Sequence, residues 1–180
     1  MIISFSYLIF FGIQNAIAFD FHPITLATTL LAYIFWFYEE KKFTSFWLSL
    51  ILFMGLQENF FLTASALGIY LIISKKDLKR GFLITLFGIG GFLLLIYLII
   101  PSFSENSFIY LPNHLKTLSA SEIIKLLFYP LTKVQVLLSS ILAFGFLPIL
   151  HPTSFIFLIE EFLQRFIGSP IPTRWVVGYQ

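Results

Sequence analysis

Long apolar segments alternate with short polar ones along the 180 residues of the chain. The apolar segments cover residues 1–19, 24–38, 43–56, 60–74, 81–100, 131–147 and 153–166. At about 1.5 Å per residue, segment 81–100 can cross about 30 Å of hydrocarbon, whereas segments 43–56 and 60–74 are short spans of about 21 to 23 Å. The pattern predicts an all-α, polytopic integral membrane protein.

We expect six or seven transmembrane helices, and the count depends on residues 1–19. This segment lacks the basic start of a signal peptide, so a transmembrane or membrane-surface helix is the better interpretation. Residues 101–121 are polar and are expected to form an extramembrane loop. Residues 122–129 combine apolar and charged positions, which predicts a short helix on the membrane surface. All of these elements are expected to form a single transmembrane domain over residues 1–180.

Composition supports the membrane class and excludes several functions. Hydrophobic residues make up 58% of the chain and charged residues 11%, with a mean hydropathy of +0.92, which leaves too little polar surface for a soluble globule. There is no cysteine, which excludes disulfides, thiolate metal sites and cysteine nucleophiles. The net charge of +2 comes with clustered basic residues at helix ends, so no nucleic-acid partner is indicated.

Basic residues gather in two short segments, residues 39–42 and 75–80. The positive-inside rule places both segments in the cytoplasm. Alternation of the helices then predicts that the other polar segments, residues 20–23, 57–59, 101–121 and the tail 168–180, lie on the external face. The chain is thus expected to be a multi-pass protein of the cell membrane with an external polar surface.

Glu58 is the most informative acidic residue. It lies between apolar residues, and a carboxylate near a bilayer usually pairs with another group or faces a polar cavity. The alternative is a favourable acid at a helix N-terminus, with Asn59 beside it. Asp20 and His22 precede a helix that begins near Pro23, where they either line the same cavity or cap free backbone N–H groups.

Two residues of the tail are candidates for binding an anion. Arg174 and Tyr179 could hold an anionic headgroup or a phosphate, because a guanidinium donates hydrogen bonds in a fork. Anchoring of the tail at the membrane interface explains them equally well.

Short motifs along the chain carry a resemblance to a known family. They include FDFHPI at residues 19–24, QEN at residues 57–59 and RW at residues 174–175. With these motifs, which are spread over nearly all of the chain, the sequence resembles an uncharacterised family of predicted membrane proteins, domain of unknown function 2079. Gln57 stands where that family often has lysine, which leaves Glu58 as the matching acid without a local ion pair.

That family in turn resembles the GT-C superfamily of multispanning glycosyltransferases. The resemblance implies a GT-C-like fold that transfers a sugar from a polyprenyl-phosphate donor to an acceptor on the external face. In such enzymes an acid in the first external loop carries the base or metal role, and this chain matches only the middle of the pattern. We therefore expect an incomplete domain that is inactive as 180 isolated residues.

The resemblance also implies roles for six residues. The catalytic candidates, which would line an external cavity, are Asp20, His22 and Glu58. The substrate-binding candidates are Asn59, Arg174 and Tyr179. The implied partners are the lipid bilayer and a polyprenyl-phosphate-linked sugar. The cofactor stays open, with a divalent metal ion as one choice, and no residue is assigned as a metal ligand.

Two alternatives to a glycosyltransferase remain. The short helices and the polar residues close to the membrane also suit a transporter or lipid flippase, although no internal repeat of the kind common in transporters is evident. The other alternative is a catalytically inactive fragment or an accessory membrane subunit.

Overall fold

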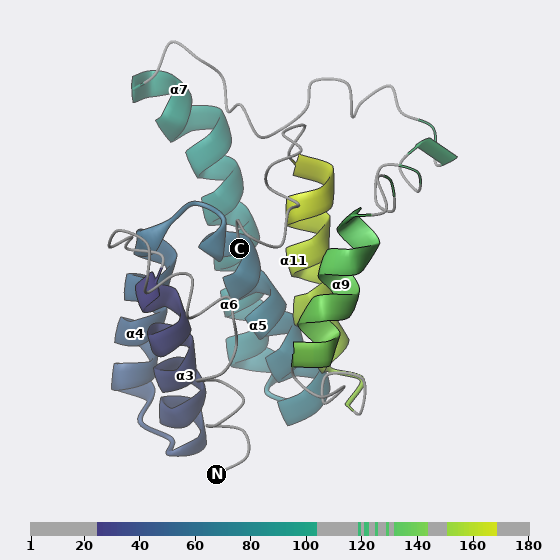
Figure 1. The fold of residues 1–180 in the computed structure, drawn as a ribbon. Coiled ribbons are helices and arrows are strands. Elements are labelled where there is room, and N and C mark those ends of the chain that lie inside the picture. The colour runs from purple at the N-terminus through teal and green to yellow at the C-terminus, as the bar shows by residue number, and fades with distance from the viewer. Residues whose placement is uncertain are drawn as a thin grey trace. The chain divides into compact units, whose positions relative to one another are not determined.

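The computed structural model describes residues 25–103, 119, 121–122, 125, 129, 132–143 and 151–168, and every regular element in these ranges is a helix (Figure 1). This confirms the predicted all-α class. The chain divides into two compact units, one of Ala16–Ile99 and the other of Met1–Asn15 with Ile100–Gln180, and each is described by itself. The single transmembrane domain stays a prediction.

Two helical hairpins form the first unit. Helices α3 (Thr25–Glu39) and α4 (Phe43–Leu56) pack together, as do α5 (Phe60–Lys75) and α6 (Leu78–Leu94), and α4 also contacts α5. The segments predicted at 24–38, 43–56 and 60–74 agree with these helices to within one residue at each end. The core consists of large apolar side chains from all four helices, chiefly Ile34, Phe46, Leu50, Phe53, Leu67, Leu71 and Ile84.

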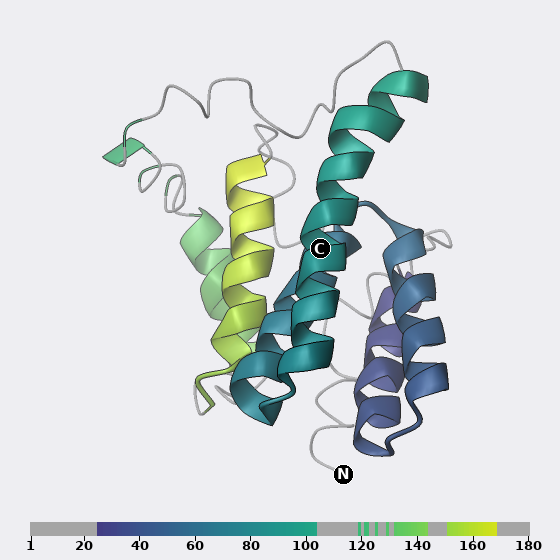
Figure 2. The ribbon, with the colours of Figure 1, turned by 180° about the vertical axis from the view of Figure 1, so that it is seen from behind.

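Helices α5 and α6 approach each other backbone to backbone. Figure 2 shows the pair from behind, with the two ribbons side by side. A Cβ atom placed on Gly68 would lie 2.6 Å from the carbonyl oxygen of Gly81, and one placed on Gly81 would lie 2.7 Å from the carbonyl oxygen of Gly68. A Cβ on Gly88 would collide with Ser65. Small residues at this spacing allow the close helix contact that is typical of membrane helices.

Hydroxyl groups join the same two helices. The Ser65 hydroxyl donates to the carbonyl oxygens of Phe61, at 3.0 Å, and of Thr85, at 3.5 Å. The Thr85 hydroxyl donates to the carbonyl oxygens of Gly81, at 2.8 Å, and of Ser65, at 3.5 Å. Each hydroxyl thus bonds within its own helix and reaches across to the partner helix. Polar groups inside an apolar pair are thereby satisfied without water.

A single long helix runs from Leu78 to Phe103 and includes α6, the π-helix η1 (Leu95–Ile99) and α7 (Ile100–Phe103). Within the described ranges it is the one helix long and apolar enough to cross a membrane by length and composition, and α4 and α5 are shorter apolar helices. The predicted segment 81–100 ends too early, because the helix continues through Pro101 to Phe103. A proline ring clashes with the carbonyl four residues earlier, and the wider π-turn that precedes Pro101 makes room for it.

The outer faces of the first unit are apolar. Large hydrophobic side chains are exposed on α4 and along the long helix, among them Leu48, Ile51, Leu52, Phe82, Leu86, Phe87, Leu93 and Leu98. Exposed apolar surface of this extent suits contact with lipid or with another protein. The count of six or seven spans stays a prediction.

The second unit contains α9 (Thr132–Ala143) and α11 (Ser154–Gly168), which correspond to the predicted segments 131–147 and 153–166. The predicted surface helix at 122–129 is described at Glu122, Lys125 and Tyr129 only. At its start, the backbone N–H and the hydroxyl of Ser119 both donate to the Glu122 carboxylate, each at 2.7 Å, and the first of these bonds is the glutamate half of a capping box. These hydrogen bonds lower the pKa of the Glu122 carboxyl.

Candidate functional site

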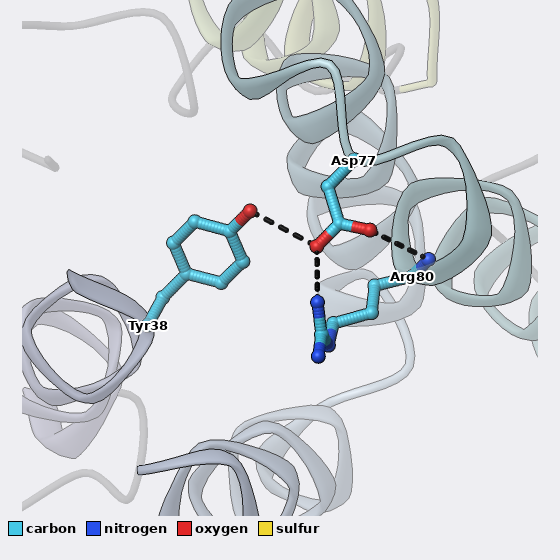
Figure 3. Close-up of polar contacts among 3 residues, drawn as sticks. All are labelled: Tyr38, Asp77 and Arg80. Atoms are coloured by element: carbon cyan, nitrogen blue, oxygen red, sulfur yellow. Dashed lines mark hydrogen bonds and ion pairs between the residues drawn. The ribbon is translucent and has the colours of Figure 1, made fainter. Parts of the chain in front are cut away.

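The two basic turns of the first unit meet at one end of its helices. Tyr38, in the last turn of α3, donates a hydrogen bond to Oδ2 of Asp77, which caps α6 (Figure 3). The oxygen-to-oxygen distance is 3.1 Å. Arg80 binds the same carboxylate through Nη1 at 2.6 Å and through its backbone N–H at 3.2 Å. We call Tyr38, Asp77 and Arg80 the polar triad.

Further contacts join the two hairpins around the polar triad. Lys75 of α5 forms an ion pair with Glu39 of α3 at 2.5 Å. The Arg80 guanidinium lies over the ring of Phe43, with 3.6 Å from its central carbon to the ring centroid. The hydrogen bond with Glu39 raises the pKa of Lys75 above its usual value of 10.5, so Lys75 is cationic at neutral pH. Both basic turns are therefore held at the same end of the unit.

Asp77 is the centre of this electrostatic arrangement. Burial raises the pKa of its carboxyl, but hydrogen bonds from Arg80 and Tyr38 outweigh burial, and the pKa lies below the usual value of 3.8. Because the folded pKa is the lower one, the ionised group stabilises the fold above pH 3.8, and this contribution is lost as the pH falls through the folded pKa.

We expect acid to weaken the wild-type fold more than it weakens Asp77→Asn. The measurement is the midpoint of thermal unfolding in detergent, followed by tryptophan fluorescence between about pH 6 and pH 2.5, a range that spans the titration of aspartates. The difference in unfolding midpoint between wild type and Asp77→Asn should shrink as the pH falls. A difference that stays constant would show that folding does not lower the pKa of Asp77. Glu40→Gln is the control, since Glu40 is exposed and its nearest ion pair, with Lys42, is 3.7 Å long.

The predicted acidic site lies at the other end of the same helices. Gln57 is extended (φ −160°) and ends α4, and Asn59 precedes α5. Glu58 is half-buried between them, and its carbonyl oxygen accepts from the N–H of Phe61 at 3.3 Å. The stacked rings of Phe53 and Phe60 join the two helices near the turn, with centroids 4.6 Å apart.

The structure therefore brings together two of the six predicted site residues, Glu58 and Asn59. Asp20, His22, Arg174 and Tyr179 lie outside the described residues. Asn59, the N-cap residue of α5, makes no side-chain capping hydrogen bond. Within the described part of the chain, no group of three or more histidine and acidic residues is placed to hold a metal ion.

Sequence reasoning missed two features. One is the polar triad, because Tyr38 and Asp77 are 39 positions apart and only the packing of the hairpins joins them. The other is Lys133, on the first turn of α9, whose exposed fraction is 1%. The sequence does contain a signal for Lys133, because a lysine inside an otherwise apolar segment of a membrane protein is usually functional or paired.

The described residues form helices with apolar outer faces and with basic residues at helix ends, as expected of a helical membrane protein. The comparison with protein families agrees, because a family model matches residues 1–179. The chain belongs to the family described as predicted membrane protein (DUF2079). No curated protein and no solved structure matches it.

Proposed function

We propose that this chain is part of a multi-pass membrane glycosyltransferase that takes a sugar from a polyprenyl-phosphate donor on the external face. The observation that supports the proposal is that the basic turns of the first unit and the turn with Glu58 lie at opposite ends of its helices. Its basic turns lie together at one end, through the contacts of Tyr38 with Asp77 and of Glu39 with Lys75. The turn with Glu58 lies at the other end of α4 and α5.

The positive-inside rule assigns the basic end to the cytoplasm, so Glu58 and Asn59 face outward. Helices of 14 and 16 residues give a distance of about 21 to 24 Å between the two ends. Glu58 lies at the outward end of these helices, where a half-buried carboxylate can orient the hydroxyl of an acceptor. Its neighbour Asn59 adds an amide for a second hydrogen bond.

The chemistry needs an acceptor hydroxyl held in line with the sugar, a base for its proton, and cations or dipoles for the departing phosphate. Glu58 is assigned to the acceptor. Asp20 and His22 remain candidates for the same external cavity. Arg174 and Tyr179 are the candidates for the donor phosphate, because a guanidinium binds phosphate oxygens through two parallel hydrogen bonds.

The test is sugar transfer by the full-length protein in vesicles that contain a radiolabelled polyprenyl-phosphate sugar. We expect Glu58→Gln to lower the transfer rate at least tenfold, because the amide keeps the size of the side chain but accepts weaker hydrogen bonds from the acceptor hydroxyl. Glu40→Gln is the matched control at the basic end and should leave the rate unchanged. A panel of hexose and pentose donors defines the sugar.

Two results would contradict the proposal in different ways. Wild-type protein that consumes none of the lipid-linked donors would exclude the glycosyltransferase itself. Wild-type transfer with equal rates for Glu58→Gln and Glu40→Gln would keep the activity and remove Glu58 from the site.

A further inference from the structure

The basic end of the first unit has more cations than its acids can pair. Its acids are Glu39, Glu40 and Asp77, and they pair with Lys75, Lys42 and Arg80 at 2.5, 3.7 and 2.6 Å. The three remaining lysines of the two turns are Lys41, Lys76 and Lys79, and all three are exposed. After internal pairing, a local charge of about +3 is left on one surface.

The positions of two of these lysines are unusual. Lys41 has φ 57° and Lys76 has φ 54°, both in the left-handed region, where glycine or asparagine is the ordinary choice after a helix. Lys76 ends α5 in this conformation and donates its backbone N–H to Leu71. The helix dipole favours a cation there and offsets part of the backbone strain. Even so, both hairpin turns place a lysine where an uncharged glycine fits more easily.

Contacts between the turns keep the three lysines on one surface. The hydrogen bond from Tyr38 to Asp77 and the ion pair of Glu39 with Lys75 join the turn at Lys41 to the turn at Lys76. Asp77 is fully engaged by the polar triad, so it does not neutralise the neighbouring lysines. The acids therefore hold the turns together, and the lysines remain available to an external anion.

Apolar side chains border this surface directly. Leu78, next to Lys79, is 67% exposed, and Trp36, one helical turn before the first basic turn, is 49% exposed. A lysine beside exposed apolar surface matches the boundary between phosphate headgroups and acyl chains, where tryptophan is also common. A soluble anion would gain nothing from the apolar border, whereas a lipid would.

We propose that Lys41, Lys76 and Lys79 form a binding surface for the headgroup of an anionic phospholipid, whose acyl chains lie along Leu78 and the neighbouring apolar side chains. This inference is independent of the glycosyltransferase, because it concerns the opposite end of the helices. A basic residue near an anionic membrane surface strengthens binding about fivefold, so three of them account for about a hundredfold.

The experiment is native mass spectrometry of the purified chain in a non-ionic detergent, with phosphatidylglycerol or phosphatidylcholine added. We expect wild-type protein to retain phosphatidylglycerol preferentially. The variant Lys41→Asn, Lys76→Asn, Lys79→Gln should lose about a hundredfold in affinity for phosphatidylglycerol and show no preference. Asparagine is used at the two left-handed positions because it tolerates that backbone.

A matched pair of single variants controls for the loss of charge alone. Lys79→Gln should weaken phosphatidylglycerol binding, whereas Lys125→Gln, which removes the same charge from an exposed position of the other unit, should not. Equal effects of the two variants would overturn the proposal. So would equal retention of both lipids by the wild type, or displacement of phosphatidylglycerol by pyrophosphate at similar concentration, which would identify a soluble anion as the ligand.

The wild type also provides a test that needs no variant to fold. Raising the salt concentration from about 50 to 500 mM shortens the screening length severalfold, so phosphatidylglycerol should be released while any bound phosphatidylcholine stays. Retention of phosphatidylglycerol at high salt would show that the headgroup does not contact the lysines.

Discussion

Gly68→Leu is expected to separate α5 from α6 and to give the largest loss of stability of any single change considered for this chain. Even the first carbon of a side chain at this position would meet the carbonyl oxygen of Gly81 and the backbone nitrogen of Thr85 at 2.6 Å. These are backbone atoms, so they cannot move aside as a flexible side chain would. Overpacking usually costs 1 to 3 kcal/mol, and we expect about 3 kcal/mol or more here.

The matched control is Gly90→Leu, on α6 of the same hairpin. No atom lies within 4 Å of a Cβ placed on Gly90. Replacing a glycine in a helix interior stabilises the helix by roughly 0.5 to 1 kcal/mol, so this variant should be as stable as the wild type or slightly more stable. The measurement is thermal unfolding in detergent, followed by circular dichroism. Similar midpoints for the two leucine variants would show that α5 and α6 do not pack through Gly68.

Asp77→Ala should cause the second largest loss of stability, because one carboxylate makes three separate contacts. It caps the N-terminus of α6, accepts from Tyr38 across the two hairpins and pairs with Arg80. The Asp77 side chain is 14% exposed and Arg80 is 34% exposed, so the ion pair is discounted for solvent screening. With a cap and a hydrogen bond each worth about 1 kcal/mol, we expect a loss of about 2 kcal/mol in unfolding free energy.

A double-mutant cycle with Tyr38→Phe isolates the contact between the hairpins. Tyr38→Phe removes only the hydroxyl and should cost about 1 kcal/mol alone, but much less when Asp77 is already alanine. Glu40→Ala is the control and should stay within about 0.5 kcal/mol of the wild type, because exposed ion pairs contribute little. Fully additive losses at Tyr38 and Asp77 would mean that the two side chains are not coupled in solution.

Much of the first unit follows from the order of residues alone. Phe43 and Leu56 were the predicted ends of a helix and are its ends, since a charged run precedes the first and a polar turn follows the second. The start of α6 was predicted three residues late, because apolar content was counted from Gly81 and the cap at Asp77 was overlooked. Local signals therefore set the ends of helices wherever they were recognised.

The contacts between helices were beyond the reach of the pattern. Nothing in the sequence around Gly68 says that its neighbour is Gly81, because an apolar helix offers several faces of similar hydrophobicity. The same applies to Tyr38, which looked like an ordinary aromatic residue at a membrane interface. At the candidate site, Glu58 and Asn59 were found as neighbours because they are adjacent in sequence. The four other predicted residues would need long-range contacts that a linear pattern does not contain.

The pairing of α5 with α6 also constrains how the chain is made. Only Lys76 and Asp77 link the two helices, so α5 can pack against α6 as soon as both helices have formed. Ser65 leaves the ribosome 20 residues before Thr85, its partner across the helix pair. At a synthesis rate of 5 to 20 residues per second, the face of α5 that packs against α6 is uncovered for roughly one to four seconds before Thr85 is made. During that interval the small and hydroxylated residues of this face, among them Ser65 and Gly68, lack the partner helix that covers them in the fold.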